Sequence, residues 1–165
     1  MAKILLTGAS GFIGKHLLKA LLIEKHEVIA VVRDKVKLHE FCENFDNLKV
    51  IECELGNFYE LNEFLSDESI STTIHLAWDG SSGVKRADYD LQLKNIKATL
   101  ELIEISAKLG CKHFISTGTV SENLVELKNA NIKSQNMIYA AAKLSLYNLA
   151  KVLCSTCDIK FTGVD

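Results

Sequence analysis

Two residues one helical turn apart could do proton chemistry. Tyr139 and Lys143 lie in the segment 138–152, whose pattern is strongly helical. Residues four apart lie on one helix face, so we expect the phenol and the ammonium to be neighbours. A nearby cation lowers the pKa of a tyrosine because it favours the phenolate. We therefore predict that Lys143 lowers the pKa of Tyr139 and makes it a proton donor and acceptor near neutral pH.

A second stretch, residues 7–14, reads Thr-Gly-Ala-Ser-Gly-Phe-Ile-Gly and could bind phosphate. It follows a short apolar run and precedes leucines at helical spacing in 17–22, which predicts a strand, a turn and a helix. Gly8 and Gly11 would let the backbone approach a pyrophosphate, and Gly14 would let the helix pack on the strand. The helix N-terminus would add free N–H groups and a positive dipole end. An ordinary strand–loop–helix connection is the alternative interpretation.

The second predicted strand, 28–32, ends at Arg33 and Asp34. In a dinucleotide fold this end faces the adenosine ribose, where a carboxylate prefers the 2′-hydroxyl of NAD and an arginine prefers the 2′-phosphate of NADP. Arg33 is one of two arginines in the chain, and a guanidinium can hold phosphate at two points. We expect a slight preference for NADP, with a solvated strand-end charge as the alternative.

Cysteine and histidine spacing does not match a metal site. The five cysteines are an odd number at irregular spacing, which favours reduced thiols over a disulfide framework. Cys154 and Cys157 form a C-x-x-C pair, but no second pair of ligands follows at the spacing of a zinc site. We interpret this pair as a coincidence at a helix end and predict no bound metal.

Composition is that of an ordinary globular protein. Hydrophobic residues make up 48% and charged residues 24%, and the net charge is −2, so neither nucleic acid nor a membrane is indicated as a partner. At 165 residues the prediction is one domain, 1–165. No apolar run reaches membrane-spanning length, and the chain begins with a strand rather than a cleavable leader. We expect a cytoplasmic protein.

Strand and helix patterns alternate along the whole chain. Further strands are predicted at 48–52, 72–76, 113–117 and 159–164, and helices at 15–24, 35–45, 57–65, 88–109 and 138–152, with a long polar stretch at 118–136. Asn57 would cap its helix, with Glu60 at the capping-box position. The helix 88–109 is the longest predicted, and its wide apolar stripe could also meet a second subunit.

This alternation predicts an α/β fold, with a doubly wound parallel sheet of about six strands and helices on both faces. That architecture is the Rossmann fold. The loop 77–83 would lie at the carboxyl edge of the sheet, where ligands bind in open α/β sheets.

Taken together, the motifs resemble those of an extended short-chain dehydrogenase/reductase. The resemblance rests on the glycine turn, the strand end His75-Leu76-Ala77, the segment after strand 113–117 and the Tyr139/Lys143 pair, and it covers the whole chain. The chain is most similar to the NAD-dependent epimerase/dehydratase family, whose members mostly act on nucleotide sugars. The resemblance implies NAD(P)-dependent hydride transfer coupled to proton transfer through Tyr139.

The resemblance also implies roles for individual residues. Thr119 would hydrogen-bond the substrate oxygen, and Thr117 is the alternative residue for this role if the alignment shifts. Lys143 would hold the nicotinamide ribose and adjust the pKa of Tyr139. The implied cofactor-binding residues are Gly8, Ser10, Gly11, Phe12, Ile13 and Gly14 at the glycine turn, Arg33 at the adenosine, Glu54 and Leu55 at the adenine, Ala77 beyond the fourth strand, and Tyr139 and Lys143. Val120 and Ser121 stand where relatives with 4,6-dehydratase activity carry an Asp-Glu pair, so that reaction is disfavoured.

Family members continue past the sixth strand into a smaller C-terminal region that holds the sugar nucleotide, and we expect this chain to lack it. The leading hypothesis is the cofactor-binding domain of a nucleotide-sugar epimerase or reductase. One alternative is an NADPH-dependent reductase of small carbonyl compounds, suggested by the strand end 31–34. Another is a non-catalytic dinucleotide-binding sensor or fragment. In relatives the two long helices often pair across a homodimer, which the mass in solution would test.

Overall fold

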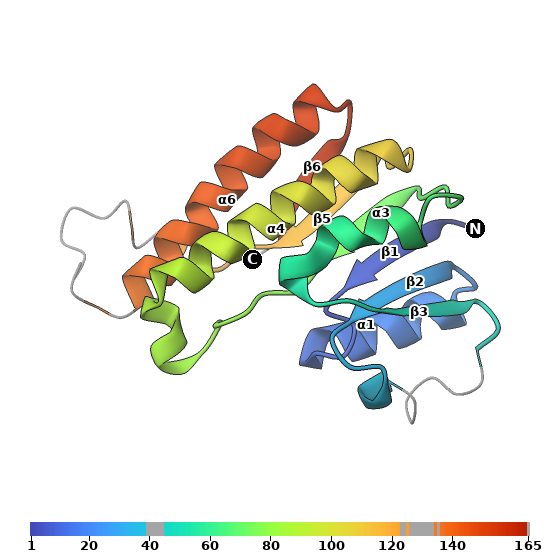
Figure 1. Ribbon diagram of the computed structural model, residues 1–165, viewed down its shortest axis with the longest axis horizontal. Coiled ribbons are helices and arrows are strands. Elements are labelled where there is room, and N and C mark those ends of the chain that lie inside the picture. Colours follow the sequence, from blue (N-terminus) through green and yellow to red (C-terminus); the bar gives the residue numbers. More distant parts are fainter. Residues whose placement is uncertain (39–44, 123–124, 126–133, 135, 165) are drawn as a thin grey trace.

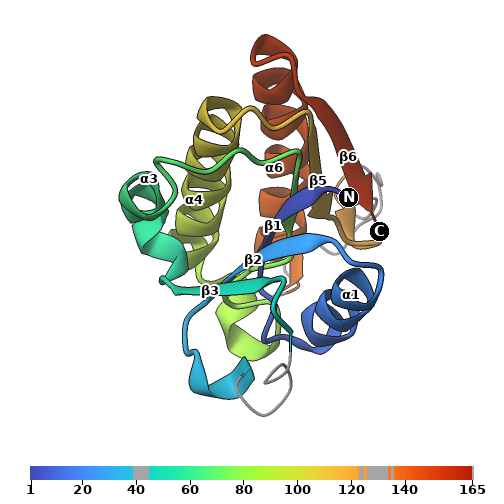
Figure 2. The same ribbon diagram turned by 90° about the vertical axis from the view of Figure 1, so that its right-hand side faces the viewer.

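The fold is a six-stranded parallel sheet with helices on both faces (Figures 1 and 2). The computed structural model describes residues 1–38, 45–122, 125, 134 and 136–164. The strand order is β3-β2-β1-β4-β5-β6. The chain therefore runs outward from β1 to β3 and returns to β4 on the other side of β1. This confirms the predicted doubly wound sheet.

The described elements follow the predicted ones closely along the chain. The strands are β1 (Lys3–Thr7), β2 (Glu27–Val32), β3 (Leu48–Glu52), β4 (Thr72–His75), β5 (His113–Thr117) and β6 (Lys160–Val164). The α-helices are α1 (Phe12–Ile23), α3 (Leu61–Phe64), α4 (Tyr89–Lys108) and α6 (Asn136–Thr156), with 3-10 helices η1 (Leu55–Glu60) and η2 (Gly83–Ala87). The observed strand ends agree with the predicted ones to within one residue.

Some predicted elements differ or lie outside the described residues. The predicted helix 35–45 lies mostly outside them, although 36–38 are helical, and so does most of the irregular stretch 118–136. The prediction that 88–109 is the longest helix is wrong, because α6 has 21 residues and α4 has 20. The helix α6 extends beyond its predicted C-terminal end because Cys154 is buried in the core cluster and Leu153 packs against it.

Two apolar layers hold the sheet, because successive side chains of a strand point to opposite faces. On one face, Leu6 of β1 packs in a buried cluster with Leu18 of α1. On the other face, Leu5 packs in a second cluster with Leu102 of α4 and Phe114 of β5. In Figure 2, α1 lies on one side of the sheet and α3, α4 and α6 lie on the other. These layers fix the carboxyl ends of the strands at one edge.

The segment after β3 differs from its prediction. A helix over 57–65 capped by Asn57 and Glu60 was expected, whereas the chain forms η1 and then the short α3, neither with a side-chain hydrogen bond at its N-cap. Asn57 lies inside η1 with φ −116° and ψ 21°. Leu55 and Phe58 are buried in the same cluster as α4. Burial of these two side chains starts the helical turn before the polar cap could do so.

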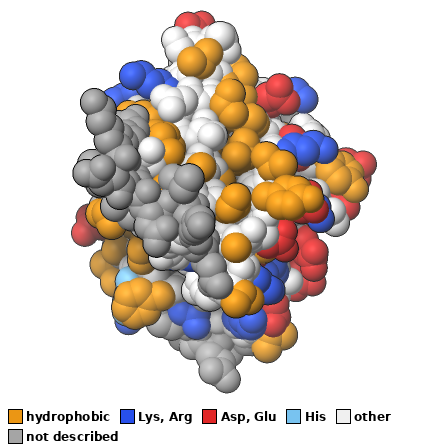
Figure 3. Space-filling view, turned by 90° about the vertical axis from the view of Figure 1, so that its left-hand side faces the viewer, with side chains coloured by type: hydrophobic (Ala, Val, Ile, Leu, Met, Phe, Trp, Pro, Cys, Tyr) orange, Lys and Arg blue, Asp and Glu red, His pale blue; other side chains and the backbone are white. Residues whose placement is uncertain are grey.

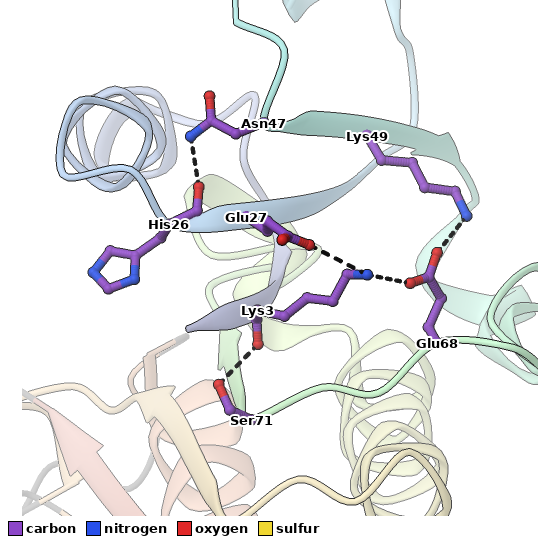
Figure 4. Close-up of polar contacts among 7 residues, drawn as sticks. All are labelled: Lys3, His26, Glu27, Asn47, Lys49, Glu68 and Ser71. Carbon is purple, nitrogen blue, oxygen red and sulfur yellow. Dashed lines mark hydrogen bonds and ion pairs between the residues drawn. The ribbon is translucent and has the colours of Figure 1, made fainter. Parts of the chain in front are cut away.

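The amino ends of the strands are joined by a network of ion pairs (Figure 4). The Lys3 Nζ on β1 lies 2.6 Å from Glu68 and 3.4 Å from Glu27 on β2. The Lys49 Nζ on β3 lies 2.8 Å from Glu68. The two lysines lower the pKa of the Glu68 carboxyl. These four residues line a cavity of about 630 Å³, and their charges are paired with one another.

The helices α4 and α6 leave apolar side chains exposed. Tyr89 and Leu93 of α4 are 62% and 58% exposed, and Leu149 and Val152 of α6 are 49% and 65% exposed. Hydrophobic side chains gather in a band on the face shown in Figure 3. The expected pairing of these helices with a second copy stays a prediction. Within the residues described, no helix is long and apolar enough to span a bilayer.

We expect Glu68→Gln to lower the free energy of unfolding at pH 7 by up to about 1 kcal/mol, because two lysines lose a partner near the surface. Because folding lowers the pKa of Glu68, its stabilisation is present above the ordinary carboxyl value of 4.5 and is lost as the pH falls through the lowered value. The difference between the two proteins should therefore narrow in acid. Urea unfolding at several pH values measures it.

The matched control for this experiment is Glu63→Gln, which removes an exposed carboxylate from α3. This change should leave stability within about 0.5 kcal/mol of wild type. Equal stability of wild type and Glu68→Gln at pH 7 and low salt would show that the network contributes nothing.

Candidate functional site

The turn between β1 and α1 brings the backbone against the end of β4. Gly8 has φ +73°, and a Cβ there would lie 2.7 Å from the Ala77 nitrogen, so a side chain is excluded. A Cβ on Gly14 would collide with the Gly8 carbonyl oxygen. Gly11 is the N-cap of α1 and has no side chain to cap it. The first N–H groups of α1 are therefore left for an anion.

Two cavities meet at this turn along the carboxyl edge of the sheet. The β2-side cavity, about 320 Å³, extends to Arg33 and Leu55. The α6-side cavity, about 360 Å³, extends to Tyr139 and Lys143. Both are lined by Gly8, Gly11, Leu76, Trp78 and Ser81. They form one groove from the end of β2 to the start of α6, and each has a volume typical of small-molecule sites.

Most of the predicted cofactor residues line this groove. The β2-side cavity includes Gly8, Ser10, Gly11, Arg33, Leu55 and Ala77, and the α6-side cavity includes Gly8, Gly11, Phe12, Ile13, Gly14, Tyr139 and Lys143. Glu54 is exposed, and Leu55 lines the cavity where Glu54 does not. The Phe12 side chain is 86% exposed, so its backbone N–H is the group built into the turn.

Two of the three predicted catalytic residues, Tyr139 and Lys143, line the α6 end of the groove, where the lining includes Thr117 and not Thr119. The Thr119 hydroxyl acts to lower the pKa of the Tyr139 phenol. The Lys143 Nζ donates to the Thr117 carbonyl oxygen at 2.7 Å and lies 4.0 Å from the centroid of the Trp78 ring. The Trp78 and Tyr139 rings meet edge to face, with their centroids 6.1 Å apart. The choice between Thr119 and Thr117 stays a prediction, because Thr117 lines the cavity whereas Thr119 affects the pKa of the phenol.

The prediction that Lys143 lowers the pKa of Tyr139 is wrong in direction. Burial raises the pKa of Tyr139 above its ordinary value of 10.0, although Arg86 and the Thr119 hydroxyl oppose this and Glu122 adds to it. Burial also lowers the pKa of Lys143, to about 8. Spacing along the helix brings the two residues close, but burial outweighs the charge effect that spacing suggested.

Three residues of the segment between β4 and α4 were missed from the sequence, namely Trp78, Asp79 and Arg86. The Arg86 guanidinium carbon lies 4.5 Å from the centroid of the Tyr139 ring. The Asp79 Oδ1 accepts a hydrogen bond from the Arg33 Nη1 at 2.8 Å. The sequence indicated that this loop lies at the carboxyl edge of the sheet. It did not indicate which side chains of the loop turn toward the groove.

A buried chain of hydrogen bonds lies beneath the groove. The Thr99 Oγ1 donates to the Asn95 carbonyl at 2.9 Å, so it accepts from the His75 Nε2–H, also at 2.9 Å. The His75 Nδ1 then accepts from the Thr7 Oγ1 at 2.7 Å, and Thr7 accepts from the Ala77 N–H at 3.4 Å. One neutral tautomer of His75 satisfies every bond. Burial lowers the pKa of His75 to about 3, which agrees with a neutral ring.

Two buried side chains of α4 hold the loop above this chain. The Asn95 side chain donates to the Asp79 carbonyl at 2.8 Å and accepts from the Asp79 N–H at 2.9 Å. The Gln92 side chain accepts from the Trp78 Nε1 at 2.8 Å and donates to the Gly80 carbonyl at 3.2 Å. The helix α4 therefore sets the conformation of the loop by polar contacts, in addition to covering the sheet.

Among the described residues, no three His, Cys, Asp or Glu side chains gather as a metal site. Cys53, Cys111, Cys154 and Cys157 are free thiols. Burial raises the pKa of Cys53 to about 11 and that of Cys154 to about 12. These two thiols stay protonated at neutral pH and are poor nucleophiles.

Comparison with protein families matches residues 4–165 to the NAD dependent epimerase/dehydratase family. The chain belongs to this family. It is 30% identical over 122 residues to dTDP-6-deoxy-L-talose 4-dehydrogenase (NAD(+)) of Aggregatibacter actinomycetemcomitans, over 72% of this chain and 42% of the relative. It is also 30% identical over 127 residues to UDP-glucose 4-epimerase of Klebsiella pneumoniae, over 72% of this chain and 90% of the relative.

Solved structures show the same fold. The UDP-Glc/GlcNAc 4-epimerase of Campylobacter jejuni superposes with a TM-score of 0.78 at 19% identity, over 99% of this chain and 52% of that one. The UDP-glucose 4-epimerase of Thermus thermophilus, in complex with NAD, superposes with a TM-score of 0.77 at 19% identity, over 98% of this chain and 53% of that one. The chain thus spans about half the length of these structures.

Stability should depend on pH through His75. Its pKa is 6.5 when unperturbed and about 3 in the folded chain, so the unfolded chain takes up the proton first as the pH falls. The stabilisation from the neutral ring is complete above pH 6.5 and is lost progressively toward pH 3. We expect this residue to lower the free energy of unfolding by up to about 1.4 kcal/mol per pH unit in that window.

Urea unfolding of wild type and His75→Asn between pH 7 and pH 4 measures this slope. The variant should be less stable at pH 7, because the hydrogen-bonded chain is broken, but its slope should be flatter. His16→Asn, which removes an exposed histidine, is the matched control and should keep the wild-type slope. If the stability of His75→Asn falls with pH as steeply as that of wild type, the buried neutral ring is not the cause of the pH dependence.

Proposed function

We propose that this member of the epimerase/dehydratase family binds NAD and supplies the proton chemistry for hydride transfer on a nucleotide sugar. One observation carries the proposal, namely the continuous groove that joins the glycine turn to Tyr139 and Lys143. Two relatives, a dTDP-sugar dehydrogenase that uses NAD(+) and a UDP-glucose epimerase, support this substrate class.

The groove fits a dinucleotide in one direction. The pyrophosphate would lie at the N-terminus of α1, where Gly8 allows close approach and no side chain caps the helix. The adenosine would occupy the β2-side cavity against Leu55, and the nicotinamide would enter the α6-side cavity beside Lys143. When bound, NAD would supply the hydride acceptor or donor.

Tyr139 would exchange a proton with the sugar oxygen at the reacting carbon. Burial keeps the phenol protonated at rest, so it is ready to donate to a sugar carbonyl oxygen. The Thr119 hydroxyl, which acts to lower the pKa of the same phenol, would stabilise the phenolate that remains. The Lys143 ammonium, anchored on the Thr117 carbonyl, would hold the ribose hydroxyls. In the opposite direction the phenolate would accept the proton.

We assign NAD rather than NADP as the cofactor. The sequence-based preference for NADP depended on Arg33, but its guanidinium is paired with Asp79. The Asp79 carboxylate at this end of the groove would also repel a 2′-phosphate. The structurally similar UDP-glucose 4-epimerase of Thermus thermophilus, whose structure is a complex with NAD, supports the same choice.

Trp78 provides a direct measurement of cofactor binding, because it is the single tryptophan and lines both cavities. We expect NADH to quench its emission, with energy transfer to the nicotinamide, and to bind more tightly than NADPH. Ser10→Asp places a carboxylate at the phosphate site and should weaken NADH binding by at least about tenfold. Ser66→Asp, at an exposed position away from the groove, should bind like wild type.

If neither dinucleotide changes the Trp78 emission, the proposed binding site is wrong. If Ser10→Asp and Ser66→Asp bind NADH equally well, the phosphate does not lie at the glycine turn. Tighter binding of NADPH would overturn the assignment of NAD alone.

The catalytic proposal predicts that Tyr139→Phe lowers kcat by about 10²–10⁴-fold, because the proton donor is lost. The NADH affinity should stay within about threefold of wild type, since the ring and its contacts remain. Turnover would be followed by nicotinamide absorbance and by sugar NMR with dTDP- and UDP-hexoses. Turnover that survives the change would remove Tyr139 from the mechanism, and cofactor binding without any turnover would favour the non-catalytic alternative.

A further inference from the structure

We infer that Arg86 is a second charged partner of Tyr139, in addition to Lys143, and that η2 delivers it as a positioning residue for the proton transfer. Its catalytic meaning rests on the proposed function, whereas the contact between the two side chains does not. Arg86 comes from the segment between β4 and α4, and Tyr139 from the first turn of α6. In Figure 1 these two segments lie together at one end of the molecule.

The guanidinium is held over the phenol ring by bonds to its own loop and to the first residue of α6. Its carbon lies 4.5 Å from the ring centroid. The Nε donates to the Ser81 carbonyl at 2.7 Å, and the Nη1 donates to the Asn136 Oδ1 at 2.9 Å. A planar guanidinium suits stacking on an aromatic face while its N–H groups bond at the edge. Arg86 therefore has a defined position rather than a solvated one.

Lys143 is engaged elsewhere, although it is one helical turn from Tyr139. Its ammonium donates to the Thr117 carbonyl and lies over the Trp78 ring. Trp78 in turn meets Tyr139 edge to face. The four side chains thus form a row in which each cation lies over a different ring, Arg86 over the phenol and Lys143 over the indole.

A cation over the ring face favours the phenolate, because the negative charge of a phenolate spreads into its ring. The effect is strengthened by the partial burial of the pair. Three charged groups surround the phenol. Arg86 from η2 lowers the pKa of Tyr139, Glu122 from the segment after β5 raises it, and Lys143 lies on the same helix as Tyr139. The position of η2 is thereby coupled to the proton affinity of Tyr139.

Arg86 differs from its neighbours in η2. Val84 is 76% exposed, and Lys85 is exposed as well, whereas Arg86 is half-buried. This contrast offers a matched pair of substitutions, because Arg86→Met and Lys85→Met each remove one cation from the same short segment. Arg86→Lys keeps the charge but loses the planar stack.

The first test is a titration of tyrosinate absorbance. The difference between each protein and the same protein carrying Tyr139→Phe isolates Tyr139 from the other three tyrosines. Arg86→Met should lower the acid ionisation constant of Tyr139 roughly threefold to tenfold, Arg86→Lys should fall between it and wild type, and Lys85→Met should match wild type. A cooperative urea-unfolding transition confirms that each variant is folded.

The second test is the pH profile of kcat in the oxidative direction. The limb that depends on the Tyr139 phenolate should move to higher pH in Arg86→Met and should stay in place in Lys85→Met. If neither the titration nor the profile moves, the inference about Arg86 is overturned, even where Tyr139→Phe abolishes turnover. If the titration moves but no protein turns over a nucleotide sugar, the contact stands and the proposed function fails.

Discussion

The close approach of the Gly8 backbone to the end of β4 is the constraint on which the site depends. The sheet order reverses at β1, so the turn after β1 must lie against the turn after β4. A Cβ at Gly8 would overlap the backbone at Ala77. The hydrogen-bonded chain through His75 then ties the same two strands together beneath the turns. The groove exists because two turns can meet here without side chains between them.

The two edges of the sheet use charge differently. At the amino edge, Lys3, Lys49 and Glu68 neutralise one another across neighbouring strands. That edge holds the larger cavity, but its charges are already paired. At the carboxyl edge, Lys143 is nearly fully buried and lies over an aromatic ring, and the helix N-terminus is left uncapped. Cavity size alone would therefore select a different edge from the one that carries the glycine turn and Lys143.

The loop between β4 and α4 contacts residues at both ends of the groove. Its Asp79 meets Arg33 at the β2 end of the groove, and its Arg86 meets Tyr139 at the α6 end. Buried Gln92 and Asn95 hold the loop from below. In this family fold, a change in these two side chains would act at both ends of the groove. The loop is thus a structural part of the site and more than a connection.

The sequence by itself determined the strands, most helices, the glycine turn and the residues that could do acid–base chemistry. These depend on local periodicity and on spacing along one element, as with Tyr139 and Lys143 on α6. It could not place Arg33 against Asp79, or Arg86 over Tyr139, because these partners lie 46 and 53 positions apart and meet only when the sheet assembles. It also could not give the direction of the Tyr139 pKa shift. Burial decides that direction, and burial is a property of the packed structure rather than of neighbouring residues.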